Sequence, residues 1–489
     1  MNLHQDKISK IEKIGYSLGD LAANLIFQTL MTFLAFFYTD VYQISPSWSS
    51  IIIFVGGITG SLFNPLMGII ADRTRTRWGK FRPWLLWTSI PLGVVGILAF
   101  STPDFSDTGK VIYAMSTYIL LMAVYASNNV PYTSLSGVIT GNMSERNSIT
   151  SYRFVAVMVA QFIIQVLLLP LVLIMGDGDK AQGFHEIFIL FACAGSIMFL
   201  IAFFTTKERI APSAKQKSSI KTDVKDVFKN KPWISMLIAI VLLFVAMGIR
   251  NGSNVYYFSY YLDEGQLSIF LNGLGFYGFI EWLDRVSKAM GFIGFNWPED
   301  TSTTAFSLYS AVSILFKLTG IVISKRLADK YGKRNIFGIS LFFSALFLSA
   351  YYFYSPKAIV LVFVTQAFYG LSIGLLMPLL WAMVADVVDY SEWKTRRRAT
   401  ATVFSITSLG FKVGLSIGGS LVAGILFLYG YDVDMDHSMK VQNGVKMLIS
   451  IYPALASFIG VISLYFYEIN KKMEQQIEND LRLRRLNDE

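Results

Sequence analysis

The sequence predicts an all-α membrane protein with twelve membrane-spanning helices in two related halves of six. Hydrophobic residues make up 54% of the chain and charged residues only 15%, whereas soluble globular proteins carry about 25% charged residues. Twelve apolar runs reach the ~20 residues that a helix needs to cross a bilayer. A basic stretch, Ala71–Pro83, has a second copy about half a chain later at Lys325–Asn335, which indicates the two halves.

We expect the spans to follow the apolar runs. In the N-terminal bundle, residues 1–206, they cover roughly 15–39, 46–70, 83–102, 111–139, 153–175 and 185–206. In the C-terminal bundle, residues 233–470, they cover roughly 233–262, 305–324, 335–354, 357–385, 400–429 and 443–468. The polar, lysine-rich stretch 207–232 is predicted to be a cytoplasmic linker loop, and 471–489 a cytoplasmic tail.

The charge of the loops predicts the orientation. Basic residues cluster after even-numbered spans, at 71–83, 207–231, 325–334 and 392–398. The loops after odd-numbered spans are neutral or acidic, with Asp104, Asp107, Asp177, Asp179, Asp432, Asp434 and Asp436. Cytoplasmic loops carry the excess of Lys and Arg, so both termini are expected in the cytoplasm. The same rule accounts for the net charge of +9 without a nucleic-acid partner.

We therefore expect a multi-pass protein of the cell (inner) membrane, in contact with lipid and monomeric, and without a removable signal peptide. One connection is unusually long. The aromatic insert 263–304 lies on the outer side, where we expect an amphipathic or lid-like segment at the outer mouth. The alternative is a decoration that packs on the outer face.

Several spans carry polar groups that are expensive at membrane depth and normally face a cavity or a partner. Asp20, Asn24 and Gln28 are spaced by four residues on one face of the first span. The other candidates are Asn128 and Asn129 in the fourth span, Arg153 opening the fifth, Arg250, Asn254 and Tyr257 in the seventh, Lys317 in the eighth and Lys412 in the eleventh.

Structural roles compete with binding for these residues. Asn, Gln and Tyr in spans often only hydrogen-bond across helices, and Asp20 and Arg153 could anchor a membrane interface. Lys317 can extend toward the cytoplasm. Gating is expected near the basic loops, from Asp72 and Arg73 after the second span and from Asp386 and Asp389 ending the tenth.

The cations within the spans outnumber the acids. Arg153, Arg250, Lys317 and Lys412 face a single internal acid, Asp20. An unpaired buried cation is costly, which predicts either an anionic group on the substrate or a solvated cavity.

Enzymatic chemistry is not indicated. The three histidines, His4, His185 and His437, lie outside the predicted cores of the spans, and no metal-ligand spacing, P-loop or GxSxG motif occurs. We expect no enzyme, no cofactor and no ATP-driven pump.

Four stretches resemble one family closely. FYTDV at Phe37–Val41, the long motif Asn64–Trp84, SERNSITSYRF at Ser144–Phe154 and Met383–Arg398 look like the glycoside–pentoside–hexuronide:cation symporters. These melibiose permease-like proteins belong to the major facilitator superfamily. The resemblance covers nearly the whole chain except the insert 263–304.

The resemblance implies the major facilitator fold, a central sugar site and alternating access by rocking of the two bundles. The sugar-binding arginine of the family matches Arg153, and its lysine in the eleventh span matches Lys412. The sugar-binding acid falls on Asn24, with Asp20 one turn away.

The departures from the family bear on coupling. Its cation-binding acids fall on Gly60, Asn64 and Asn129, and an aromatic of the sugar site falls on Thr133. A hard cation prefers charged oxygen ligands. We therefore expect no sodium coupling at this site, but proton coupling through Asp20 or facilitated diffusion.

The expected function is import of a sugar or glycoside, with a preference for an acidic sugar such as a hexuronide or a sulfonated sugar. Arg153 and Lys412 would anchor the substrate, and polar side chains would bind its hydroxyls. These side chains are Asn24, Gln28, Asn129 and Asn254, with Arg250 and Tyr257 lining the outer half. The alternatives are a neutral glycoside or pentoside symporter or uniporter, and a sugar sensor that binds without transport.

Overall fold

The computed structural model describes residues 8–140, 142–209, 230–289, 297–298, 300–395, 400–432 and 438–487. Within these ranges the regular elements are helices, and one isolated bridge joins Thr76 and Gly79. Twelve helical stretches in the described chain are long and apolar enough to cross a membrane. The predicted all-α membrane fold is therefore confirmed.

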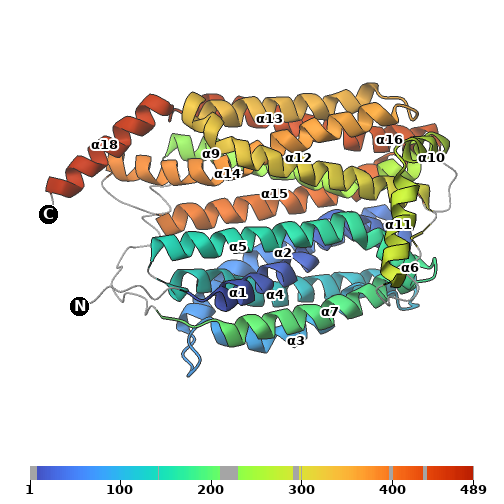
Figure 1. Ribbon diagram of the computed structural model, residues 1–489, viewed down its shortest axis with the longest axis horizontal. Coiled ribbons are helices and arrows are strands. Elements are labelled where there is room, and N and C mark those ends of the chain that lie inside the picture. Colours follow the sequence, from blue (N-terminus) through green and yellow to red (C-terminus); the bar gives the residue numbers. More distant parts are fainter. Residues whose placement is uncertain are drawn as a thin grey trace. The chain divides into compact units, whose positions relative to one another are not determined.

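The chain divides into two compact units. The first comprises Met1–Lys215, Leu271–Ser307 and Tyr431–Met435. Its spans, coloured blue to green in Figure 1, are α1 (Lys10–Phe36) with a π-helical turn (Phe37–Val41), α2 (Pro46–Arg73), α3 (Arg82–Ala99), α4 (Asp107–Ile139), α5 (Met143–Phe162) continued by a π-helical turn (Ile163–Leu167) and α6 (Leu168–Met175), and α7 (Lys180–Thr205). Helix α1 packs on α5 and α7, and α4 packs on α2 and α3.

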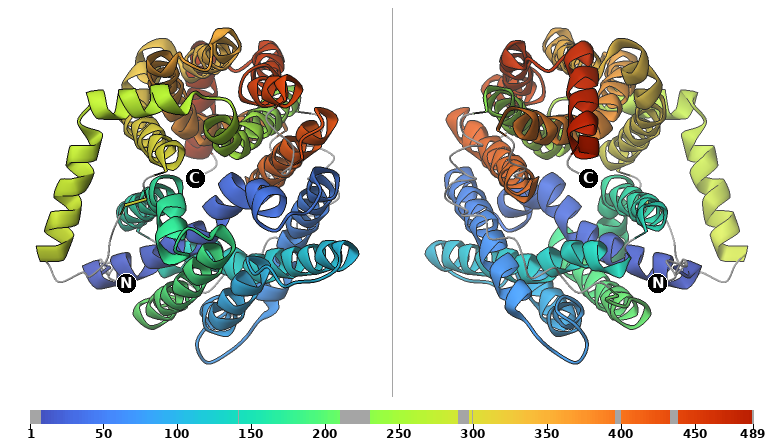
Figure 2. Two further views of the ribbon diagram at one scale, coloured as in Figure 1. Left: turned by 90° about the vertical axis from the view of Figure 1, so that its right-hand side faces the viewer. Right: turned by 90° about the vertical axis from the view of Figure 1, so that its left-hand side faces the viewer.

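The second unit comprises Gln216–Phe270, Leu308–Gly430 and Asp436–Glu489. Its helices are α9 (Lys231–Tyr260), α12 (Thr301–Tyr331, whose first turns belong to the first unit), α13 (Lys333–Ala350), α14 (Ile359–Thr395), α15 (Thr400–Leu428), α16 (Met439–Ile449), α17 (Ile451–Ser463) and α18 (Lys471–Asn487). Helix α9 lies against α15 and α17, with Trp233 and Leu243 in the buried core. The end-on views in Figure 2 show the spans of each unit running side by side.

Side chains at the ends of helices satisfy backbone groups that have no partner inside the helix. Ser9 caps the N-terminus of α1, and its hydroxyl accepts a hydrogen bond from the Glu12 N–H. Asp179 caps the N-terminus of α7, and its carboxylate accepts hydrogen bonds from two N–H groups of the first turn. These are the residue types that favour the first position of a helix.

Three expected boundaries were wrong in an informative way. Arg153 does not open its helix but lies inside α5, which begins at Met143. Asp386 and Asp389 do not end the tenth span, because α14 continues to Thr395. The second basic stretch is almost wholly helical, since only Gly332, with φ of 88°, separates α12 from α13. Apolar length marks the membrane part of a helix, whereas the helix itself continues into water.

The first basic stretch is held by an acid that follows α7. The Glu208 carboxylate accepts hydrogen bonds from the backbone N–H groups of Lys80, Phe81 and Arg82 at 2.9, 2.8 and 3.0 Å. Gly79 has φ of 112°, and a Cβ there would collide with the same carboxylate. A glycine is needed at Gly79 for both reasons.

Replacing Glu208 with Ala is expected to loosen this loop. Hydrogen bonds to a charged group contribute about 1.5–3 kcal/mol each, so we expect trypsin to cleave after Arg75, Arg77 or Lys80 at least about tenfold faster. Mass spectrometry of the fragments from reconstituted protein measures the rate. Glu186→Ala, near the other end of α7, is the control, and a cleavage rate equal to that of the wild type would contradict this account.

Candidate functional site

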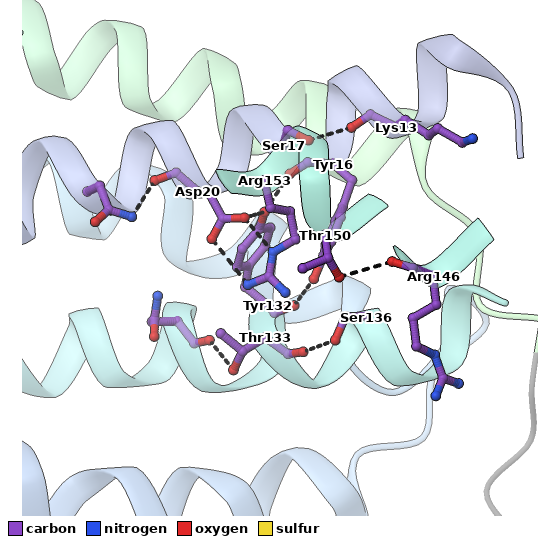
Figure 3. Close-up of polar contacts among 12 residues, drawn as sticks. Lys13, Tyr16, Ser17, Asp20, Tyr132, Thr133, Ser136, Arg146, Thr150 and Arg153 are labelled. Atoms are coloured by element: carbon purple, nitrogen blue, oxygen red, sulfur yellow. Dashed lines mark hydrogen bonds and ion pairs between the residues drawn. The ribbon is translucent and has the colours of Figure 1, made fainter. Parts of the chain in front are cut away.

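The candidate site lies where α1, α4 and α5 meet in the first unit (Figure 3). The rings of Tyr16 on α1 and Tyr132 on α4 are stacked with centroids 4.7 Å apart. The Tyr16 hydroxyl donates to the Tyr132 carbonyl oxygen at 2.8 Å. A Cβ at Gly19 would collide with the Tyr132 ring, so this glycine permits the close approach of α1 and α4.

Asp20 and Arg153 form a two-pronged ion pair against these rings. Arg153 Nε lies 2.5 Å from Asp20 Oδ2, and Nη2 lies 3.2 Å from Oδ1. The guanidinium carbon lies 5.4 and 5.6 Å from the centroids of the Tyr16 and Tyr132 rings, within the range of cation–π attraction. The Tyr132 hydroxyl lies 2.9 Å from Asp20 Oδ2 and 2.6 Å from the Tyr16 carbonyl oxygen.

This pairing changes the predicted charge balance. Asp20 supplies a carboxylate to Arg153, one of the cations for which the sequence predicted either an anionic group on the substrate or a solvated cavity. The two side chains are not equally covered, since 22% of the Arg153 side chain is exposed and 8% of Asp20. The pair uses Nε and Nη2 of the guanidinium, so Arg153 retains N–H groups at Nη1 for a further acceptor.

The neighbouring amides predicted to bind hydroxyls remain partly exposed. Asn24 is half-buried and its Nδ2 donates to the Asp20 carbonyl oxygen at 2.9 Å. Gln28 and Asn129 are also half-buried. Asn128 differs, because it is 1% exposed and donates to Thr88 Oγ1 at 2.9 Å, which is a helix-to-helix contact.

Arg250 lies inside the second unit. It is 1% exposed, donates to the Tyr309 hydroxyl and to Gln366 Oε1 at 3.0 Å, and places its guanidinium carbon 4.3 Å from the Tyr351 ring centroid. Asn254 and Tyr257, the other two candidates on α9, are buried as well. Arg250 Nε, Asn254 Oδ1 and the Tyr257 hydroxyl have no hydrogen-bond partner among the described residues, so the place of these three residues in the substrate site stays a prediction.

Replacing Arg250 with Met is expected to reduce stability without changing binding. The substitution removes the cation from its tyrosines and leaves Gln366 less well satisfied, at a cost of about 2–4 kcal/mol. We expect the midpoint of thermal unfolding in detergent to fall by several degrees, while the substrate affinity of the folded fraction is retained. The exposed Arg326→Met variant of α12 is the control. A loss of affinity at unchanged stability would return Arg250 to the binding site.

The candidate gating residues occupy different surroundings. Lys333 Nζ donates to both oxygens of Asp386 at 2.7 and 2.8 Å and lies 2.8 Å from Glu474 Oε1 on α18. Asp389 is half-buried one turn farther along α14. In the first unit, Asp72 and Arg73 are exposed at the end of α2. Lys412 is the remaining residue that was predicted to bind substrate, and it is half-buried on α15 of the second unit.

One contact of this site and one contact outside it were not predicted. Tyr16 lies four residues before Asp20, a spacing that puts both on one helix face and could have indicated the contact. The contact outside the site involves Asp40 in the π-helical turn after α1, whose Oδ1 accepts from the Tyr431 hydroxyl at 2.6 Å within the first unit. Single π-helical turns occur frequently at functional sites.

The positions that match the cation ligands of the family contain no carboxylate. Asn64 Nδ2 donates to the Gly60 carbonyl oxygen of its own helix at 2.8 Å. Across the described residues, no group of three or more His, Cys, Asp or Glu side chains is placed to hold a metal ion.

Comparison with known proteins gives a consistent result. A family model described as MFS/sugar transport protein matches residues 15–287 and 299–471. The inner membrane symporter YicJ of Escherichia coli (strain K12) is 32% identical over 485 residues, covering 97% of this chain and 96% of its own. The isoprimeverose transporter of Lactiplantibacillus pentosus is 30% identical over 473 residues, covering 96% and 91%.

A solved structure, the crystal structure of a D-xylose–proton symporter, shares the fold. Its TM-score is 0.59 at 12% sequence identity, with 92% of this chain and 95% of that chain covered.

Proposed function

This chain belongs to the MFS/sugar transport protein family, and we propose that it imports a sugar or glycoside across the inner membrane by alternating access. The family and its fold are those of a membrane transporter. The relatives named inner membrane symporter and isoprimeverose transporter support this proposal. The charges of the loops support a cytoplasmic location of both termini. We further propose that the protein works as a monomer.

The observation that carries the proposal is the Asp20–Arg153 pair. A partly exposed guanidinium with N–H groups left over can donate to a substrate oxygen, while its carboxylate partner can take up a proton. Asn24, Gln28 and Asn129 provide amides for substrate hydroxyls within the same unit. Lys412 belongs to the second unit and stays a predicted cation for the substrate. Because Arg250, Asn254 and Tyr257 are buried, we assign them to packing of the second unit.

We propose that the same pair couples transport to a proton. Protonation of Asp20 removes its charge and leaves Arg153 with an unbalanced positive charge. An anionic group on the substrate restores the balance, and loss of the proton to the cytoplasm returns Asp20 to Arg153 and displaces the substrate. This exchange favours an acidic sugar, such as a hexuronide or a sulfonated sugar.

A neutral glycoside is the second candidate. It is favoured by the fact that Asp20 already neutralises Arg153 in this structure. The pair would then remain formed and offer both donors and acceptors to sugar hydroxyls.

Counterflow in proteoliposomes tests the function. Vesicles loaded with galacturonate, glucuronate, a sulfonated sugar or a galactoside are diluted into trace radioactive sugar of the same kind. We expect transient uptake with at least one sugar, and uptake confined to the galactoside would select the neutral class. Binding without exchange would identify a sugar sensor instead.

Sodium is expected to have no effect on sugar affinity. The positions matching the cation ligands of the family lack carboxylates, and sodium binds weakly without charged oxygens. Titration calorimetry in sodium and in choline buffers should give equal dissociation constants. A sodium-dependent shift of about threefold or more would refute this prediction.

A further inference from the structure

Helix α11 (Phe276–Ala289), in the insert between the seventh and eighth spans, has two faces of opposite character. Phe276, Phe279, Trp282 and Val286 follow one another at intervals of three and four residues and form an apolar stripe. The opposite side carries the polar side chains, which are Tyr277, Glu281, Asp284, Arg285 and Lys288. The ring centroids of Phe279 and Trp282 lie 5.9 Å apart, so the stripe is a continuous aromatic surface.

The middle of the apolar stripe is not covered by the described part of the chain. Phe279 is 50% exposed and Trp282 is 51% exposed, while Phe276 and Val286 are half-buried. No described helix packs along α11. Figure 1 shows α11 running crosswise to the spans α5 to α7 of its own unit, near the end of α6, and Figure 2 shows it to one side of these spans. A lid over a central mouth would instead bury its apolar face against the spans.

The connections of α11 join it to two membrane-spanning helices. Helix α10 (Glu264–Gly273) begins soon after the seventh span ends at Tyr260, and its Leu267 is fully buried. After α11 the eighth span begins at Thr301. Just before this span, Trp297 Nε1 donates to Thr304 Oγ1 at 2.8 Å. In the sequence, α11 therefore lies between the end of the seventh span and the start of the eighth.

We propose that α11 lies flat in the headgroup boundary of the bilayer leaflet opposite to the two termini, with its aromatic stripe facing the acyl chains. A helix that runs crosswise to the spans of its unit and exposes an apolar face is oriented as an interfacial helix would be, and Trp and Phe are typical of the apolar face of such helices. The charged side chains of the polar face, Glu281, Asp284, Arg285 and Lys288, sum to zero net charge. Zwitterionic lipid therefore suffices as the partner, and the insert is a membrane anchor, not a lid.

Spin labelling tests this placement in the full chain reconstituted into nanodiscs. Cys193 is the single cysteine and is exposed, so Cys193→Ser provides a background for one nitroxide at a time. Phe279→Cys reports the apolar stripe, and Glu281→Cys, two residues away on the other face, is the matched control. Power saturation with oxygen and with a water-soluble nickel complex measures the depth of each label.

We expect the label at position 279 to be reached by oxygen more than by nickel, at a depth of about 5–10 Å, and the label at position 281 to show the reverse. Equal access of nickel to both would place α11 in water, and shielding of both from both reagents would place it under protein; either result overturns the proposal. Trp282→Cys and Arg285→Cys repeat the comparison if a first variant is not recovered. The contrast should be the same in phosphatidylcholine alone and with added phosphatidylglycerol, and a requirement for the anionic lipid would overturn the charge argument.

Discussion

Replacing Arg153 with Ala is expected to weaken substrate binding by roughly 100-fold or more. The substitution removes the guanidinium N–H groups that are expected to donate to the substrate. It also leaves Asp20, of which only 8% is exposed, without its ion-pair partner. Each hydrogen bond lost between a charged guanidinium and the substrate costs about 1.5–3 kcal/mol of binding free energy, and each 1.36 kcal/mol is about a tenfold change. Titration calorimetry in detergent, with the sugar identified by counterflow, measures the affinity.

Arg146→Ala is the matched control, because Arg146 lies on the same helix two turns earlier and donates to a backbone carbonyl, that of Thr140. Arg153→Lys should recover part of the affinity, since an ammonium keeps the charge but cannot form the two-pronged pair. If Arg153→Ala and Arg146→Ala both bound sugar like the wild type, Arg153 would not belong to the site.

Replacing Asp20 with Asn is expected to abolish accumulation of sugar against a gradient while counterflow continues. An amide can still accept a hydrogen bond from Arg153 but cannot carry a proton. Uptake by proteoliposomes under an imposed pH gradient should therefore stop at equilibrium with the outside concentration. Radioactive sugar retained by the vesicles measures this level.

Asn24→Ala, one turn farther along α1, separates coupling from binding. Asn24 is assigned to a substrate hydroxyl, so its loss should weaken binding while leaving accumulation in place at saturating sugar. Full accumulation by the Asp20→Asn variant would show that Asp20 does not carry the coupling proton.

The sequence was sufficient to predict the twelve spans, because apolar length and loop charge are set by the bilayer. It could not predict where each helix ends. Helix α12 continues to Tyr331 and α14 to Thr395. Their last turns contain charged residues, which are compatible with a helix in water, so the end of the apolar run does not mark the end of the helix. For the insert, the sequence predicted an amphipathic segment. It could not predict what the two faces of α11 contact, because such contacts depend on the tertiary structure.

The candidate site was also predicted only in part. Asp20 and Arg153 stand out as charges at membrane depth, yet they are 133 residues apart, and periodicity cannot show that they meet. The sequence places Arg250 on a polar face of α9, but only the tertiary structure shows that Tyr309, Tyr351 and Gln366 cover this face. Spacing identifies a helix face and does not identify its neighbour.

A map of the protein with its sugar bound tests the central claim most directly. We expect the ligand among α1, α4 and α5, with one of its oxygens within about 3.2 Å of an Arg153 guanidinium nitrogen. Ligand density remote from these three helices, with the Asp20–Arg153 pair unchanged and untouched, would contradict the account.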